Sequence, residues 1–223
     1  MKIALIGYGK MGHAIEALAG GRGHEIVATV DNDADWARLS NKADVAIEFS
    51  TPTTAEANIR RCWQLGLPVV AGTTGWYDRL DTLVADCRRQ RNALFVASNF
   101  SIGMNIMFAL NERLAQLMAS HPEYHVDISE THHIHKLDAP SGTALTLRDQ
   151  IAPYRPATDI PIASFREGEV PGIHTVTYDS EVDTLSLTHS AKSRQGLALG
   201  ALLAAEFLVG RQGYYTMKDL LAL

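Results

Sequence analysis

Two different patterns of apolar and polar residues divide this chain. Over roughly the first hundred residues, short apolar runs without polar alternation are separated by segments of helical periodicity. Continuous apolar runs of this length are typical of strands buried on both faces, as in a parallel sheet covered by helices. The predicted strands cover residues 2–6, 26–30, 45–49, 68–71 and 94–97.

Helix signals lie between these strands. We expect helices over 10–19, from Pro52 with Thr51 as N-cap to a C-cap at Gly66, and over 78–89. The connection 31–44 is too short for much of a helix. Right-handed crossovers then predict an α/β fold with a Rossmann-type doubly wound parallel sheet.

After Asn99 the pattern changes. A helix over 104–118 precedes an alternating strand over 124–130 and a helix from about 142 to 151, and three further alternating strands cover 162–166, 174–178 and 184–189. Alternation is typical of an antiparallel sheet with one face solvated or covered by a partner. An Ala- and Leu-rich helix over 197–209 and a short helix that Thr216 could cap end the chain.

The sequence therefore predicts two domains. A dinucleotide-binding domain covers 1–102 and is completed by the C-terminal helices, about 195–223. A second α+β domain with a mostly antiparallel or mixed sheet covers 103–194 and serves substrate binding and oligomerisation.

Composition narrows the classes of function. Of 223 residues, 46% are apolar and 20% charged, and the formal net charge is −5, so nucleic acid is not an expected partner. No apolar stretch reaches the roughly 18 residues that span a membrane. Cys62 and Cys87 lie in amphipathic helical patterns and no signal-peptide pattern is evident, so we expect buried thiols in a cytoplasmic protein.

A glycine-rich loop follows the first predicted strand. It reads Gly7-Tyr8-Gly9-Lys10-Met11-Gly12 and opens the first predicted helix, and Asp31 ends the next strand. Such glycines permit a tight turn, close approach of the backbone to a pyrophosphate and helix–strand packing, while Asp31 would accept hydrogen bonds from the adenosine ribose. This favours NADH, although Lys10 could attract the additional phosphate of NADPH. The alternative is a turn with incidental glycines and a solvated aspartate.

Three more loops begin at carboxyl ends of predicted strands, where open α/β sheets bind ligands. They supply small polar groups suited to a nicotinamide and its ribose, although strand-to-helix turns with capping hydroxyls would look similar. The candidates are Phe49, Gly72, Thr73, Thr74, Ala97, Ser98, Asn99 and Phe100.

The densest chemistry lies between Glu130 and Ala144. His132, His133, His135 and Lys136 fall within this segment. Because these groups would repel one another if all were charged, their protonation states must be separated by their environment, as in acid/base sites. A fully extended chain would hold His132 and Lys136 roughly 13 Å apart, so we expect the strand to end near Glu130 and a loop to gather the cluster.

A predicted helix start follows the histidines. Pro140 and Ser141 would precede first-turn amides of Gly142 and Thr143 that are free to bind an anion such as a substrate carboxylate. Any one of these histidines alone would more often be a surface or packing residue. Metal ligation by His132, His133 and His135 is a further alternative, but adjacent histidines point in different directions and Lys136 would repel a cation, so no metal is expected.

These residues carry a resemblance that covers essentially the whole chain. Residues 130–144 fit the pattern Glu-x-His-His-x-x-Lys-x-Asp-Ala-Pro-Ser-Gly-Thr-Ala at every fixed position, and residues 72–75, 99–103, 166–168 with His174, and 189–200 support it. The chain thus resembles the 4-hydroxy-tetrahydrodipicolinate reductase (dihydrodipicolinate reductase) family. The resemblance implies NAD(P)H-dependent reduction of 4-hydroxy-tetrahydrodipicolinate to tetrahydrodipicolinate, in the diaminopimelate route to lysine, by a homotetramer.

The resemblance also implies roles for single residues. His132 would be the catalytic acid/base and Lys136 the proton donor, while His133, Gly142 and Thr143 would hold the dicarboxylate substrate. The glycine loop, Asp31 and the three strand-end loops would hold the cofactor. The glycine loop is one residue shorter than is common in the family, the 31–44 region is contracted, and Asn32 stands where some members carry arginine, so NADH is the expected cofactor with NADPH possible.

Two other functions fit parts of the pattern. A nucleotide-sensing binding protein would need Gly7 and Asp31 but neither His132 nor Lys136. A reductase acting on another small cyclic dicarboxylate would share every motif and differ only in its substrate.

Overall fold

The computed structural model describes residues 1–39, 43–156, 159–193 and 195–223. The chain divides into two compact units. The first combines Met1–Ile102 with Gln195–Leu223, and the second is Gly103–Arg194. Each unit is described by itself.

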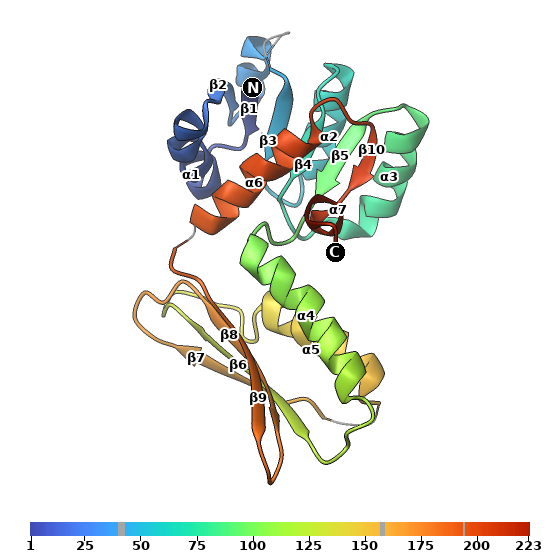
Figure 1. Cartoon of the computed structure of the whole chain (residues 1–223). Coiled ribbons are helices and arrows are strands. Elements are labelled where there is room, and N and C mark those ends of the chain that lie inside the picture. Colours follow the sequence, from blue (N-terminus) through green and yellow to red (C-terminus); the bar gives the residue numbers. More distant parts are fainter. Residues whose placement is uncertain (40–42, 157–158, 194) are drawn as a thin grey trace. The chain divides into compact units, whose positions relative to one another are not determined.

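The first unit contains a six-stranded sheet in the order β10-β5-β4-β3-β1-β2, with every neighbouring pair parallel (Figure 1). Its strands are β1 (Lys2–Ile6), β2 (Glu25–Val30), β3 (Val45–Glu48), β4 (Val69–Ala71), β5 (Ala93–Val96) and β10 (Gly213–Tyr215). The predicted Rossmann-type class is confirmed. The sequence analysis missed β10, because three half-buried residues directly after a turn form no continuous apolar run.

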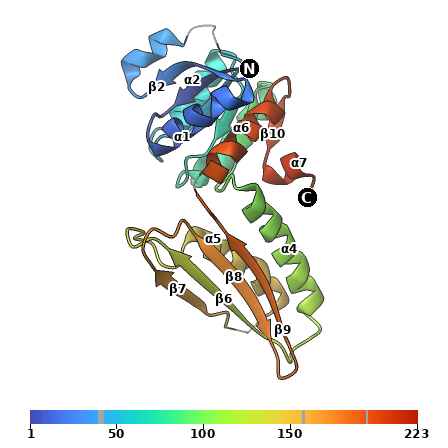
Figure 2. The same cartoon turned by 60° about the vertical axis from the view of Figure 1, so that its left-hand side comes forward.

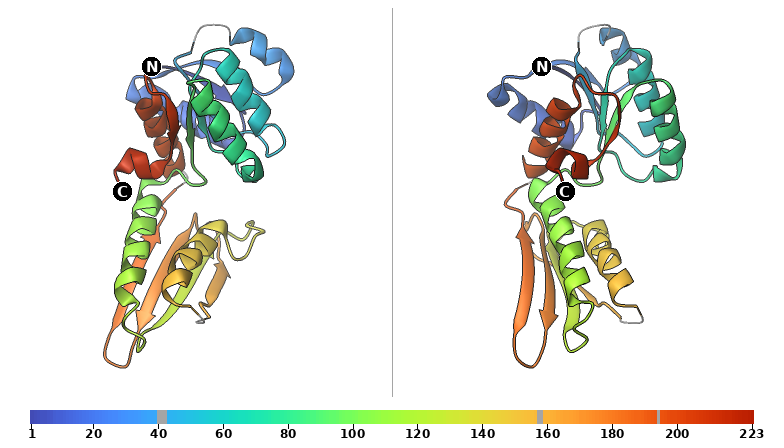
Figure 3. Two further views of the ribbon diagram at one scale, coloured as in Figure 1. Left: turned by 90° about the vertical axis from the view of Figure 1, so that its right-hand side faces the viewer. Right: turned by 45° about the vertical axis from the view of Figure 1, so that its right-hand side comes forward.

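Helices cover both faces of this sheet, as the continuous apolar runs predicted. Helices α1 (Lys10–Ala19) and α6 (Gln195–Leu208) lie on one face, and α2 (Ala55–Gln64) and α3 (Leu80–Arg89) on the other (Figure 3). Alternate residues of one strand serve the two cores: Ile3 and Leu5 face α1 and α6, whereas Ala4 and Ile6 face α2 and α3. Both cysteines are buried in the second of these cores and are not disulfide-bonded.

The start of α2 differs from the prediction. The helix begins at Ala55, not at Pro52 with a Thr51 cap. Residues 51–54 instead form a turn in which the Thr54 amide donates to the Thr51 carbonyl at 3.1 Å and the two threonine hydroxyls lie 2.8 Å apart. The hydroxyls that suggested a cap therefore stabilise a turn before the helix. At the other end Gly66 adopts a φ of 73°, which suits glycine.

Within the part of the chain that the structure describes there are also four short 3₁₀ helices: Gly20–Arg22, Asp33–Arg38, Tyr77–Arg79 and Ala152–Tyr154. The second of these lies in the contracted segment 31–44, and residues 40–42 of that segment lie outside the described residues. At the C-terminal end α7 (Met217–Leu221) begins with the capping box of Thr216 and Asp219. None of the helices described is long and apolar enough to cross a membrane.

The second unit is a four-stranded mixed sheet in the order β7-β6-β8-β9. Its strands are β6 (His125–His132), β7 (Ile162–Arg166), β8 (Ile173–Asp179) and β9 (Thr184–Ser190). Only the β6–β7 pair is parallel. Helices α4 (Ile102–Met118) and α5 (Gly142–Ile151) pack on one face (Figure 2), and their apolar residues form a core with alternate residues of β6 and β8.

The end of β6 also differs from the prediction. The strand runs to His132, two residues beyond Glu130, where the sequence analysis expected it to end. The β6–β7 pairing continues to His132 opposite Arg166, and the Glu167 amide donates to the His132 carbonyl at 2.8 Å. The extra ladder bonds hold His132 in the sheet, and the loop begins only at His133.

Candidate active site

A cavity of about 530 Å³ lies at the carboxyl ends of β1, β2 and β3 in the first unit. This is the edge at which doubly wound sheets bind nucleotides. The residues lining it are Ile6, Gly7, Tyr8, Gly9, Val30, Asp31, Asn32, Asp33, Trp36, Phe49, Ser50, Thr51, Thr54 and Asn58.

Glycine stands at each of the three positions of the first loop for a different structural reason. Gly7 has a φ of 91°, and a Cβ there would overlap the carbonyl of Phe49. A Cβ at Gly12 would lie 2.8 Å from the Gly7 carbonyl oxygen, so the third glycine lets α1 pack closely on its own loop. Gly9 has open space around it and caps α1 without a side-chain hydrogen bond. This leaves room and unpaired first-turn amides for a pyrophosphate.

Asp31 directly follows β2 and lines the cavity next to the glycine loop. Its Oδ1 accepts a hydrogen bond from the Tyr8 amide at 3.1 Å, which fixes the carboxylate against the glycine loop. Asp33 also lines the cavity, and no lysine or arginine belongs to its described lining. The surroundings of Asp31 therefore suit neutral ribose hydroxyls better than a 2′-phosphate.

Trp36 was not among the residues singled out from the sequence. It lines the cavity from the 3₁₀ helix Asp33–Arg38, the Arg61 guanidinium lies 4.5 Å from its ring centre, and Arg61 also pairs with Asp33 at 2.6 Å. A single tryptophan in a short connection carries no motif. A cavity wall at this position was therefore not predictable from the sequence pattern.

The remaining cofactor candidates do not line this cavity. They are Lys10, Met11, Gly12, Gly72, Thr73, Thr74, Ala97, Ser98, Asn99 and Phe100. Two of the strand-end loops nevertheless come together around Phe49, because a Cβ at Gly72 would overlap its ring and the Phe100 ring centre lies 5.7 Å away.

Glu48 joins two of these loops from below. The buried carboxylate accepts from the Thr73 hydroxyl at 2.9 Å and from the amide and hydroxyl of Ser50, whose amide also donates to Thr73 Oγ1 at 2.7 Å. Burial raises the pKa of Glu48 despite these hydrogen bonds. The loops after β3 and β4 are thus held as one unit.

The second unit carries a polar row across its sheet. On β6 the side chains of Val126 and Ile128 face the helices, and Glu130 and His132 continue the same face. The pairing places His174 of β8 directly opposite Glu130. An apolar sheet face therefore ends in buried charged and polar groups.

Glu130 is the centre of this row. It is 1% exposed, and its Oε1 accepts from the Ser164 hydroxyl at 2.8 Å and the Ser141 amide at 3.0 Å, while Arg166 Nη2 lies 3.4 Å away. Burial would raise the pKa of Glu130, but the hydrogen bonds from Ser141 and Ser164 outweigh it and hold the pKa below its ordinary value. Glu130 is therefore an anion at neutral pH.

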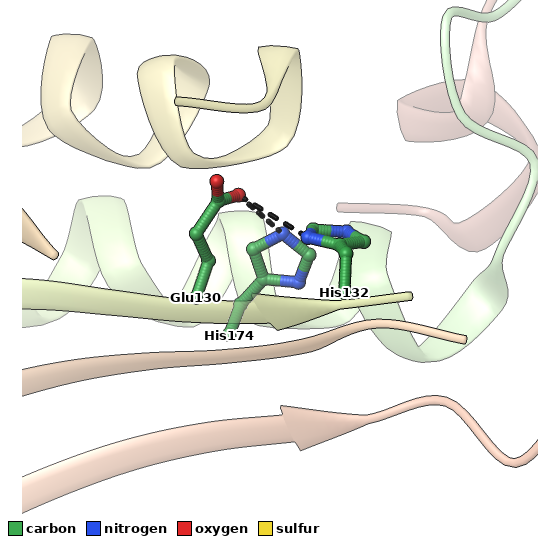
Figure 4. Close-up of side chains that lie close together, drawn as sticks. All are labelled: Glu130, His132 and His174. Atoms are coloured by element: carbon green, nitrogen blue, oxygen red, sulfur yellow. Dashed lines mark ion pairs between the residues drawn. The ribbon is translucent and has the colours of Figure 1, made fainter. Parts of the chain in front are cut away.

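Two imidazoles face this anion (Figure 4). His132 Nδ1 lies 3.5 Å and His174 Nε2 3.6 Å from Oε2 of Glu130, and the two rings meet edge to face with centres 5.0 Å apart. Burial lowers the pKa of His132, and Lys136 acts in the same direction while Glu130 opposes it. Burial lowers the pKa of His174 to about 4. Both rings are therefore neutral at pH 7.

The loop after β6 carries the other members of the cluster, His133, His135 and Lys136. It turns back with the Lys136 amide donating to the His133 carbonyl at 3.1 Å, and the ring centres of His133 and His135 lie 6.0 Å apart. Lys136 Nζ bonds both oxygens of Asp138 at 2.7 and 2.9 Å. Arg166 secures the loop to β7, because its guanidinium donates to the Lys136 carbonyl at 3.3 Å and to the Asp138 carbonyl at 2.6 Å.

Helix α5 begins at Gly142, the residue that the sequence predicted. Ser141 is the N-cap, and its hydroxyl accepts from the Ala144 amide at 3.2 Å. The Gly142 and Thr143 amides have no acceptor among the residues described. These two donors at the positive end of a helix are able to bind an anion, and they adjoin the row of Glu130 through Ser141.

Of the three histidines weighed as metal ligands from the sequence, His132 alone belongs to the described group that is close enough to share an ion. Ligand atoms of Glu130, His132 and His174 lie within 4.8 Å of one another, whereas His135 instead pairs with Glu169 at 3.1 Å. The guanidinium of Arg166 already lies 3.4 Å from Glu130 and supplies the positive charge that a metal would bring. A nucleotide site in a doubly wound unit, together with acid/base groups beside an anion site, defines a pyridine-nucleotide-dependent oxidoreductase.

Comparison with known proteins identifies the family. The model of the N-terminus of dihydrodipicolinate reductase matches residues 1–100, and the model of its C-terminus matches residues 103–221. The chain belongs to the dihydrodipicolinate reductase family. Glu130, His174 and Arg166 lie in segments that carried the resemblance, but only their pairing across the sheet reveals that they form one cluster.

Individual relatives agree with this assignment. The 4-hydroxy-tetrahydrodipicolinate reductase of Christiangramia forsetii is 47% identical over 234 residues, covering 100% of this chain and 98% of the relative. That of Akkermansia muciniphila is 36% identical and covers 96% and 95%. The fold matches dipicolinate-bound dihydrodipicolinate reductase from Paenisporosarcina sp. TG-14, with a TM-score of 0.82, 23% identity and 98% of each chain covered.

Proposed function

We propose that this protein reduces 4-hydroxy-tetrahydrodipicolinate to tetrahydrodipicolinate, with loss of water, in the cytoplasmic diaminopimelate route to lysine. The observation that carries the proposal is the segment from Glu130 to Thr143. In it a buried, neutral His132 lies in a polar row that adjoins the start of α5, where the Gly142 and Thr143 amides have no acceptor among the described residues. Relatives covering nearly the whole chain carry the name of this reaction.

The second unit would bind the substrate through its carboxylates. The Gly142 and Thr143 amides offer two N–H donors at the start of α5, and His133 lies at the start of the adjoining loop. A charge-assisted bond to an anion is worth roughly twice a neutral one, which suits a small dicarboxylate. The related Paenisporosarcina enzyme binds dipicolinate, a small dicarboxylate.

Proton transfer would fall to His132 and Lys136. Hydride addition to an imine-conjugated ring builds negative charge on a neighbouring atom, and a positioned proton donor relieves it, typically for about 10²- to 10⁴-fold in rate. Lys136 is an ammonium held by Asp138 and 21% exposed, so it remains able to reach a ligand. His132 is neutral at working pH and can accept or return a proton.

The first unit would bind the dinucleotide, which supplies the hydride. Gly7, Tyr8 and Gly9 would hold the pyrophosphate and Asp31 the adenosine ribose, while Phe49 and the loops beginning at Gly72 and Ala97 would hold the nicotinamide side. Two aspartates and no basic side chain in the described lining favour NADH over NADPH.

We propose further that the protein works as a homotetramer assembled through the sheet of the second unit. Helices cover one face of this sheet. The other face carries mainly hydroxyl side chains, among them Ser129, Thr175, Thr177 and Thr188.

A rival proposal is that the substrate is another small cyclic dicarboxylate. It would use the same substrate-binding residues of the second unit.

The test is a coupled assay. The preceding synthase generates the substrate from pyruvate and aspartate semialdehyde, and the oxidation of NADH and of NADPH is followed separately at 340 nm. Rapid oxidation, faster with NADH, is expected. If neither cofactor is oxidised although NADH binds, the substrate assignment is wrong. Faster oxidation of NADPH would contradict only the assigned preference.

A further inference from the structure

The two oxygens of Glu130 have different environments. Oε1 is fixed to the scaffold by the Ser141 amide and the Ser164 hydroxyl. Oε2 instead faces imidazole nitrogens of His132 and His174 at 3.5 and 3.6 Å (Figure 4). One oxygen therefore orients the carboxylate, and the other is presented to the proposed acid/base residue.

Burial makes this pairing specific. Nδ1 of His132 and Oε2 of Glu130 are both fully buried, and neither forms a hydrogen bond with a described residue. Oε2 contacts Nδ1 of His132 at 3.5 Å and Nε2 of His174 at 3.6 Å. A buried donor or acceptor without a partner destabilises the folded protein. The arrangement that leaves least unpaired puts the proton on Nδ1, directed at the carboxylate. At 3.5 Å this contact is longer than a hydrogen bond, and catalytic contacts that are long without substrate commonly tighten into hydrogen bonds when the substrate is bound.

The other ring nitrogen of His132, Nε2, lies near Gly172. A Cβ at Gly172 would lie 3.2 Å from Nε2 of His132, which is tighter than ordinary contact. Glycine at this position keeps the space beside Nε2 unfilled, and its φ of 151° is one that side chains disfavour. Nδ1 thus faces the carboxylate, and Nε2 faces Gly172, which carries no side chain.

We propose that Glu130 is a positioning residue that accepts the Nδ1–H of His132, selects the tautomer with an unprotonated Nε2, and keeps it in register with the anion-binding start of α5. His174 steadies the same carboxylate oxygen from the neighbouring strand, and its Nε2 also lies 3.3 Å from the Ser141 hydroxyl. A carboxylate that fixes the tautomer of a histidine base is an established device in hydrolases. The inference rests on the proposed function, which makes His132 the acid/base.

The charge of Glu130 also acts on His132. The charged and titratable groups around His132 are Glu130 on its own strand, Lys136 and Asp138 on the loop, Arg166 on β7 and His174 on β8. Glu130 is the buried anion of this set and favours the imidazolium. Replacing it by an uncharged amide should therefore lower the pKa of His132 further.

The primary experiment reads the tautomer without using activity. Protein labelled with ¹⁵N-histidine gives long-range ¹H–¹⁵N spectra in which the Nδ1–H and Nε2–H forms differ, and the signal lost in His132→Gln assigns the residue. We expect the Nδ1–H form at pH 7.5 in the wild type and loss of this single form in Glu130→Gln. An Nε2–H form in the wild type, or an unchanged signal in the variant, would overturn the proposal.

The matched control is Glu169→Gln, the same change in an exposed Glu–His pair, with His135 at 3.1 Å and Glu169 78% exposed. It should leave the His132 signal and turnover unchanged. Glu130→Gln should lower kcat about 10- to 100-fold with NADH affinity within about twofold, and should move the pH limb of kcat/KM to lower pH. A limb that does not move would count against the proposal.

Two further results separate this inference from the proposed function. Should Glu130→Gln fail to fold, the wild-type tautomer together with His174→Gln remains decisive, because that variant should keep the Nδ1–H form with the carboxylate in place. An active wild type with the wrong tautomer would overturn only the positioning role. An inactive wild type with the expected tautomers would contradict the proposed function and support the Glu130–His132 geometry.

Discussion

The amide of Ser141 donates a hydrogen bond to Oε1 of Glu130 at 3.0 Å, across eleven positions of sequence. The bond ties the end of β6 to the N-cap of α5, and both groups are buried. It therefore connects the strand that carries His132 to the helix start that is proposed to bind a substrate carboxylate. This direct hydrogen bond therefore fixes the position of His132 relative to the start of α5, in addition to the loop that connects them.

His132→Gln should lower kcat by about 10² or more while NADH affinity stays within about twofold, because glutamine keeps a polar side chain but cannot transfer protons near neutral pH. Turnover is measured in the coupled assay and NADH affinity by quenching of nucleotide fluorescence. The control is His125→Gln, the same change at the exposed start of the same strand. Near-normal turnover in His132→Gln would remove His132 from the acid/base role.

Gly142→Pro should raise KM for the substrate, and Kd for dipicolinate, about 10-fold or more, because it deletes one N–H donor to an anion. Proline is tolerated at the first helical position, and Ser141 with φ −69° and ψ 156° has the backbone that a following proline requires. Gly142→Ala retains the amide, and its Cβ has open space. Equal dipicolinate affinities in the two variants would show that this amide does not bind the carboxylate.

Asp31→Ala should weaken NADH binding about 10-fold or more and NADPH binding less, because the carboxylate proposed to accept hydrogen bonds from the ribose hydroxyls would also repel a 2′-phosphate. Kd values for both dinucleotides are obtained by calorimetry. Asp127→Ala, an exposed aspartate on the second unit, serves as the control. Unchanged NADH affinity would exclude Asp31 from the cofactor site.

His174 should make the protein acid-sensitive. Its pKa is lowered to about 4 in the folded state from an ordinary value of 6.5, so the unfolded chain takes up the proton first. The contribution of His174 to the free energy of unfolding is fully present above pH 6.5. It is lost as the pH falls to about 4, which lowers the free energy of unfolding by about 3 kcal/mol. Denaturant titrations between pH 7.5 and 4.5 should show a shallower decline for His174→Gln, and parallel curves would contradict this assignment.

Gly200→Ala should destabilise the first unit by about 2 kcal/mol or more. A Cβ at Gly200 of α6 would overlap the carbonyl of Phe100, in the loop after β5. Gly196→Ala in the same helix meets nothing within 4 Å and should leave stability unchanged or raise it slightly. Equal urea midpoints for the two variants would contradict this close approach of helix and loop.

Much of the fold could be predicted because its signals are local. Continuous apolar runs marked β1 and β3, and Gly142 marked the first residue of α5. The strand β10 and the full length of β6 depend on pairing with distant strands, which leaves no local pattern. For the same reason the sequence grouped His132 with its neighbour His133, whereas the sheet register pairs Glu130 with His174 from β8.

The proposed hydride transfer from NADH to 4-hydroxy-tetrahydrodipicolinate is tested most directly by following the hydride. The enzyme is given NADH that carries deuterium at the transferable C4 position, together with substrate generated in situ. The mass of the tetrahydrodipicolinate formed is then measured by mass spectrometry. We expect one deuterium in each product molecule, and an amount of labelled product proportional to the NADH oxidised. Oxidation of NADH without deuterium in this product would contradict the proposed hydride transfer.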